Sequence, residues 1–128
     1  MSVRTAVFDR VTAESDITDV LGTSPTRFRW RNVPQGETPP YTRYFQVARD
    51  RKRGHDGPAG LSLADLQIEH YGADPDAVDA LAETFIASLD GTNNGTVTML
   101  LTNELDAFQI DTSLWQITQT WLAQWKES

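Results

Sequence analysis

The sequence predicts an α+β domain, in which a mostly antiparallel or mixed five-stranded sheet carries two helices packed on one face. Three observations predict this class. The chain has 128 residues, which is the size of one domain, so residues 1–128 are expected to fold as a single unit. Hydrophobic residues make up 39% of the chain, enough for a core built by packing alone. Apolar residues recur at helical spacing in two regions and alternate with polar ones in others.

Two regions have the helical pattern. The first runs from Ser2 to Val20, with a break near Glu14 and a short second piece that Gly22 ends. The second begins at Asp74, an N-cap residue followed by Pro75 at the first helical position. Its apolar residues form one wide stripe that we assign to the core: Ala77, Val78, Leu81, Ala82, Phe85, Ile86 and Leu89.

Five segments are expected as strands because they are rich in apolar, aromatic or β-branched residues, most of them alternating with polar ones. These segments are residues 26–33, 41–49, 63–71, 96–102 and 114–125. Residues 50–61 are glycine-rich and charged, and we predict a loop there that is long for a hairpin connection. On the third strand, His70 shares the apolar face with Leu66 and Ile68, which indicates a partly buried, hydrogen-bonded histidine.

The charges are sorted along the chain, whose formal net charge is −7. Between Arg27 and Arg53, eight basic residues stand against two acidic ones; between Gly54 and Trp125 there are eleven acidic residues and no Lys or Arg. Such sorting is typical of a protein whose positive region meets nucleic acid, another protein, or the acidic face of another copy. Contact between copies would then be head-to-tail, which closes into a ring or grows into a filament. The simpler alternative is that the charges became unevenly distributed without any functional consequence.

The sequence offers little for catalysis. It has no cysteine, which excludes disulfides and thiolate chemistry, and no glycine-rich phosphate loop ending in Lys-Ser or Lys-Thr. His55 and Asp56 are adjacent, but no serine lies in a nucleophile motif, so we interpret them as part of a turn and keep a hydrolase only as a third hypothesis. We therefore expect no enzyme, no cofactor and no metal site. No apolar run approaches a membrane span, and no signal peptide is visible, so we expect no membrane partner.

Several motifs together carry a resemblance to a known family. Pro39-Pro40-Tyr41 enters a strand, and a charged loop then leads into His55-Asp56-Gly57-Pro58-Ala59-Gly60-Leu61. The strand Leu66-Gln67-Ile68-Glu69-His70-Tyr71-Gly72-Ala73 is followed by an alanine-rich helix that ends in Ser88-Leu89-Asp90-Gly91. This combination resembles the tail completion proteins of long-tailed bacteriophages, prophages and gene transfer agents, also called tail terminator or neck proteins. The final strand departs from the family, which tends to end in aspartate-phenylalanine-x-valine-tryptophan, but residues 120–125 keep the alternation.

The resemblance implies a structural subunit that forms a ring, commonly a hexamer, and caps the head-proximal end of the tail tube. The implied partners are other copies of the chain, the major tail tube protein and the head–tail connector protein, with DNA only as passing cargo. The implied location is the virion tail or neck, and the bacterial host cytoplasm during assembly.

The basic segment of residues 49–60 supplies the candidate contacts. The resemblance implies that it reaches the neighbouring subunit, the tail tube or the ring lumen. We favour protein contact, because a lumen lined by many positive charges would hold the passing DNA. The candidate partner or inter-subunit residues are Arg49, Arg51, Lys52, Arg53, His55 and Asp56. The alternative is a small binding domain that uses residues 49–53 to contact single-stranded nucleic acid.

Overall fold

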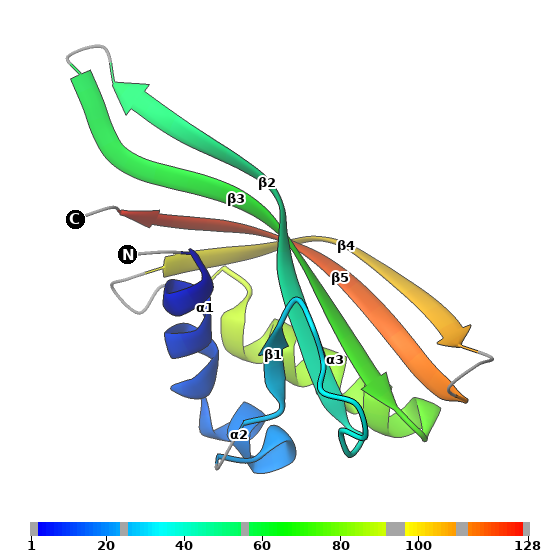
Figure 1. Cartoon of the computed structure of the whole chain (residues 1–128). Coiled ribbons are helices and arrows are strands. Elements are labelled where there is room, and N and C mark those ends of the chain that lie inside the picture. The colour runs from blue at the N-terminus through cyan, green and yellow to red at the C-terminus, as the bar shows by residue number, and fades with distance from the viewer. Residues whose placement is uncertain (1–2, 24–25, 55–56, 92–96, 110–112, 127–128) are drawn as a thin grey trace.

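The computed structural model describes residues 3–23, 26–54, 57–91, 97–109 and 113–126, and for 48–54, 57–62, 108–109 and 126 it describes the backbone alone. In chain order the elements are α1 (Val3–Thr12), α2 (Ser15–Leu21), β1 (Phe28–Trp30), β2 (Tyr41–Gly54), β3 (Gly57–Gly72), α3 (Pro75–Leu89), β4 (Val97–Gln109) and β5 (Leu114–Lys126). The helices cover one face of the sheet (Figure 1). The predicted α+β class is confirmed, and the first helical region is divided into α1 and α2 as the break near Glu14 predicted.

The strand order in the sheet is β1-β2-β3-β5-β4. β1 pairs with β2 in parallel, whereas β2 with β3, β3 with β5, and β4 with β5 are antiparallel, so the sheet is mixed. β1 and β4 therefore form its two opposite edges.

The prediction of a long loop over residues 50–61 is wrong. β2 continues to Gly54 and β3 begins at Gly57, so only residues 55–56 separate the strands, and the end of this hairpin projects beyond the rest of the sheet (Figure 1). Charged and glycine residues have low strand propensity, but cross-strand pairing overrides so weak a preference. The pairing of β2 with β3 shifts register between Gln46 and Ala48 and again between Lys52 and Arg53. Such irregularities bend a strand.

Two other strand boundaries differ from the predicted ones. The segment 26–33 contributes only the short β1, which ends before Arg31, a residue with a φ of 65°. The segment 96–102 extends to Gln109, because polar residues after Thr102 pair with β5 while facing solvent. Their lack of an apolar pattern hid this half of the strand.

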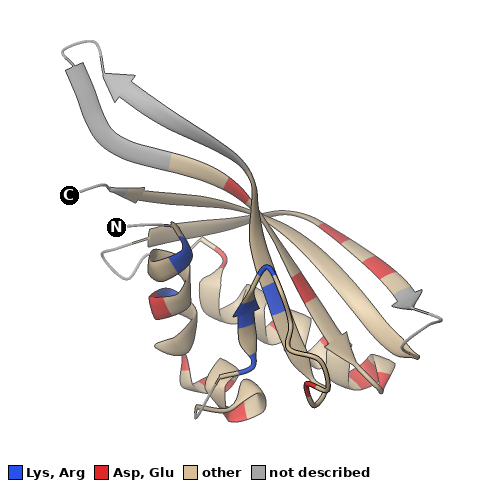
Figure 2. Ribbon diagram, in the orientation of Figure 1, with Lys and Arg blue, Asp and Glu red and all other residues tan. Residues whose placement is uncertain are grey.

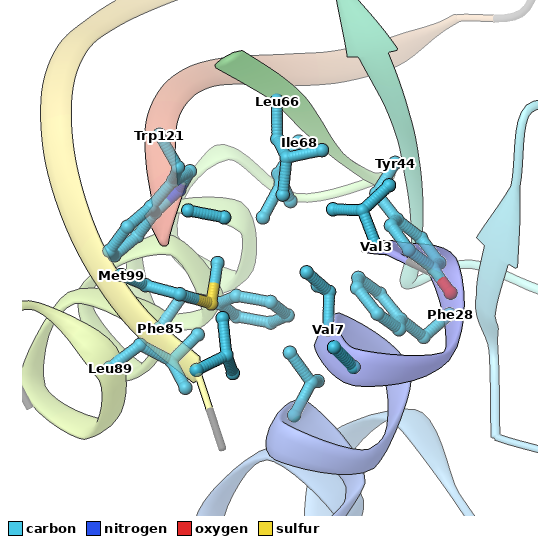
Figure 3. Close-up of a cluster of buried hydrophobic side chains, with 14 of the residues drawn as sticks. Val3, Val7, Phe28, Tyr44, Leu66, Ile68, Phe85, Leu89, Met99 and Trp121 are labelled. Carbon is cyan, nitrogen blue, oxygen red and sulfur yellow. The ribbon is translucent and has the colours of Figure 1, made fainter. Parts of the chain in front are cut away.

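The main core lies between the sheet and the helices (Figure 3). Trp121 of β5 and Met99 of β4 pack with Phe85 and Leu89 of α3, and all four are fully buried. The predicted α3 stripe is confirmed except at Ala77, which is exposed, and Ile86, which is half-buried. The predicted cap is also confirmed, because the Asp76 N–H donates to Asp74 Oδ1 at 3.1 Å.

Candidate interaction surfaces

The structure places the predicted contact segment at the far end of the β2–β3 hairpin. The backbone of residues 49–53 belongs to β2, where Arg49 pairs with Ala64 and Arg53 with Pro58. The side chains of Arg49, Arg51, Lys52 and Arg53 lie outside the described parts of the chain, as do His55 and Asp56 altogether. Their contact role stays a prediction, now for a projecting hairpin rather than a loop.

His70 is hydrogen-bonded, as the sequence predicted, and it is fully rather than partly buried. Its Nε2 lies 2.7 Å from Gln119 Oε1, which is only an acceptor, so the ring proton is on Nε2. The Thr42 hydroxyl then donates to Nδ1 at 2.9 Å. Burial lowers the pKa of His70 to about 4, so the ring is neutral at pH 7 and has a structural role.

Gln119 extends this network across the sheet, and its only signal in the sequence is a glutamine among the apolar residues that alternate along β5. The amide Nε2 donates to the carbonyl oxygen of Ala82 at 3.2 Å and to Glu104 Oε2 at 2.8 Å. The Trp121 indole N–H donates to Gln119 Oε1 at 3.2 Å. One buried side chain thereby connects β5 to β3, α3 and β4.

A second polar network lies on the sheet face away from the helices. Glu69, only 4% exposed, accepts hydrogen bonds from Arg43 Nε at 2.9 Å, from the Tyr71 hydroxyl at 2.7 Å, and from Gln67 Nε2 at 2.7 Å. The ring of Tyr41 stacks on that of Tyr71 with centroids 5.0 Å apart. Burial, with the bond to Glu69, raises the pKa of Tyr71 above its usual value. Because the carboxylate is saturated by protein donors, this network stabilises the sheet rather than offering a free acid.

A groove opens between α1, α2 and β1, with a volume of about 720 Å³. We call it the basic groove; besides threonines, it is lined by Arg4, Phe8, Phe28, Arg29, Trp30 and Tyr44, with no carboxylate. The rings of Phe28 and Tyr44 stack with centroids 4.0 Å apart, and Trp30 meets Tyr44 edge-on at 5.0 Å.

Arginines surround this aromatic floor. Arg29 Nε lies 2.7 Å from Glu37 Oε2, so its charge is partly neutralised within the chain. The Arg31 guanidinium lies over the Trp30 ring, 5.3 Å from its centroid, and extends the positive surface beyond the groove. Arg4 is exposed on α1. The groove is thus an aromatic depression with a positive rim.

The opposite edge of the sheet is acidic. Asp90 at the end of α3 accepts from the Leu101 N–H at 2.9 Å, which shows which side of α3 adjoins β4. Helical spacing puts Asp79 and Glu83 on that same side, and Glu104 and Asp106 lie on β4 itself. We call these five exposed carboxylates the acidic strip. Figure 2 shows red residues along β4 and blue ones along β1 and the adjoining part of β2.

No other kind of site emerges from the described ranges. They hold no cluster of three or more His, Asp or Glu residues that could bind a metal ion. None of their helices combines the length and apolar character that crossing a membrane requires. The candidate functional features are therefore the basic groove, the acidic strip and the projecting hairpin.

Comparisons with known proteins support the fold alone. No family model and no curated protein matches the chain. Among solved structures, a chain from the virion of a native gene transfer agent particle superposes with a TM-score of 0.68 at 16% sequence identity. The match covers 98% of this chain and 95% of that one. Over almost its whole length, this chain shares the fold of a gene transfer agent virion protein.

Proposed function

We propose that this chain is a structural protein of a phage or gene transfer agent virion, without catalytic activity. More specifically, we propose a ring-forming tail terminator, commonly hexameric in such proteins, that caps the head-proximal end of the tail tube and supports head–tail joining. Its location is then the tail or neck of the particle, after assembly in the cytoplasm of the bacterial host.

The observation that carries the proposal is the likeness to the gene transfer agent virion chain. Because it covers 98% of one chain and 95% of the other, it involves the whole domain rather than a shared supersecondary motif. Folds host many functions, so the likeness raises the expectation of a virion role without assigning one. The sequence motifs that resemble tail completion proteins point to the same role.

The distribution of charge supports ring formation. A ring requires each subunit to present two different, complementary surfaces. The basic groove and the acidic strip lie at opposite edges of one sheet and have opposite charge. The projecting end of the β2–β3 hairpin, with Arg49, Arg51, Lys52 and Arg53, is the proposed contact with the tail tube or a neighbouring subunit.

Tube assembly tests this function. The major tail tube protein from the same genome is polymerised with and without the purified chain, and tube ends and lengths are measured by electron microscopy. We expect a ring at one end of each tube and arrested growth when the chain is present. Tubes that stay uncapped and grow to the same length would contradict the terminator role.

The same material tests the nucleic-acid alternative. Neutralising Arg51, Lys52 and Arg53 to Gln is expected to weaken capping while single-stranded DNA binding stays negligible. If the chain instead binds single-stranded DNA, and the substitutions reduce the salt slope of that binding by up to about three, the nucleic-acid alternative replaces the terminator.

A further inference from the structure

We propose that the acidic strip of one copy of this chain docks against the basic groove of the next copy. The inference rests on the proposed ring-forming function and deepens it, since it names the two surfaces that meet. It commits to a second copy of the chain as the occupant of both surfaces.

Charge complementarity is the first argument. The strip gathers five carboxylates in a region where, from Gly54 to Trp125, the chain has no Lys or Arg to neutralise them. On the other side, Arg4 and Arg31 form no ion pair with any described residue, whereas Arg29 already has Glu37. Among the described residues, each surface thus carries charges that form no ion pair within the chain. Opposite charges across an interface accelerate association and fix its register.

Apolar complementarity is the second argument, because stable interfaces need buried apolar anchors as well as charge. Leu105 lies between Glu104 and Asp106 in sequence and is 61% exposed. The basic groove offers Phe8, which is 37% exposed and whose ring centroid lies 6.3 Å from that of Phe28. An exposed apolar side chain on the β4 edge therefore has an aromatic counterpart in the groove. Leu105 faces the side of β4 opposite to its acidic neighbours, but an edge strand presents both sides to a partner that approaches edge-on.

The free edge of β4 is the third argument. Near its start this edge is covered, because the Gly91 N–H donates to the Met99 carbonyl at 2.8 Å and Leu101 donates to Asp90. From Asn103 onward, no described element pairs with the outer edge of β4. Uncovered edge strands favour association, and here the open part coincides with the acidic residues of the strip.

The sheet order makes the contact directional. A two-fold dimer uses the same surface on both partners, and here it would place like charges together. Contact between the β4 edge of one copy and the β1 edge of the next uses two different surfaces. Such contacts repeat from copy to copy and close into a ring when the rotation allows.

A charge-reversal exchange tests this contact. One variant combines Asp79→Arg with Asp106→Arg on the strip, and a second combines Arg4→Glu in the groove with Arg31→Glu just outside it. Native mass spectrometry and sedimentation velocity measure association over a concentration series, and circular dichroism checks that each variant folds. The matched control is Asp65→Arg, the same reversal at an exposed position in the middle of the sheet.

We expect the wild type and the control to form the same closed oligomer, and each double variant to weaken association at least about a hundredfold. An equimolar mixture of the two variants should restore the oligomer. In an alternating ring, a reversed strip meets a reversed groove, and an unchanged strip meets an unchanged groove.

Three results would overturn the inference. They are variants that associate like the wild type, variants that dissociate but are not rescued by mixing, and a wild type that is monomeric at every concentration. None of them decides the proposed function, because tube capping is measured independently. If the mixed variants restore the oligomer but the chain does not cap tubes, the terminator role is rejected and the proposed contact between copies stands.

Discussion

The buried side chains of His70 and Gln119 form hydrogen bonds with all of their polar atoms. Gln119 uses its amide for four of them, to His70, Trp121, Ala82 and Glu104. A buried donor or acceptor that loses its partner keeps the full cost of leaving water, usually more than a satisfied bond contributes. The network therefore fixes the relative positions of the strands and α3 more than it adds net stability.

Replacing Gln119 by Leu is expected to lower the free energy of unfolding by about 2–4 kcal/mol, because several buried polar groups lose a partner at once. Gln124→Leu is the matched control, since Gln124 is exposed on the same strand, and its effect should stay within about 0.5 kcal/mol. Urea unfolding followed by tryptophan fluorescence measures both. Equal effects at the two positions would show that the network contributes no special stability.

His70 predicts a pH dependence of stability. Its pKa is about 4 in the folded protein against an ordinary value of 6.5, so the unfolded chain binds the proton first as the pH falls. The resulting stability is fully present above pH 6.5, decreases as the pH falls from 6.5 toward about 4, and amounts to about 3 kcal/mol. Urea midpoints between these pH values should fall steeply for the wild type and less steeply for His70→Gln. Parallel pH profiles would contradict this assignment.

Among the helices and strands, those with a periodic apolar pattern were predicted correctly from the sequence. Apart from Ala77 and Ile86, the α3 stripe was predicted correctly, as was the buried face of β3 with Leu66, Ile68 and His70, because the residues of each face follow one period. The second half of β4 and the end of the β2–β3 hairpin were missed, because edge and projecting strands need no buried face. There, strand structure depends on pairing with a distant partner, which residue patterns do not encode.

The candidate surfaces, too, could be predicted from the sequence only in part. Charge sorting is visible in the sequence, but the sequence does not order the strands and so could not place the two charges at opposite edges. The Glu69 network was missed because Glu69 lies on the polar face of an alternating strand, and alternation does not indicate which residues of that face are buried. Tyr41 and Tyr71, the aromatic residues that cover it, were the available signal.

The junction between β3 and α3 depends on a glycine. A Cβ atom on Gly72 would lie 2.6 Å from Val78 Cγ2, and Val78 is buried against Ile117. We expect Gly72→Ala to destabilise the protein by about 1–3 kcal/mol through this overlap. In a Val78→Ala background the same change should cost clearly less, because the clashing methyl group is gone. Equal costs in both backgrounds, measured by urea unfolding, would show that the overlap is relieved elsewhere.

At the scale of the whole molecule, the separation of charge between the two sheet edges is the feature that most needs a partner. Isolated surface ion pairs contribute little, but complementary fields across an interface govern encounter and register. If copies associate through these edges, salt must weaken the contact. The same salt should change the stability of the isolated subunit much less.

We therefore expect the dissociation constant of the oligomer to rise by at least about tenfold between low salt and about 1 M salt, where the Debye length is about 3 Å. Sedimentation velocity in a salt series measures this. If high salt leaves association unchanged, or strengthens it as it strengthens apolar contacts, charge does not govern the association.

The proposed function places the chain in the virion, where the tail meets the head. The most direct measurement is gold labelling of an epitope-tagged copy in particles produced by the bacterium that carries the gene, viewed by electron microscopy. We expect label at one place on each particle, the head–tail junction. Label along the tail, at its distal tip, or on no particle at all would contradict it.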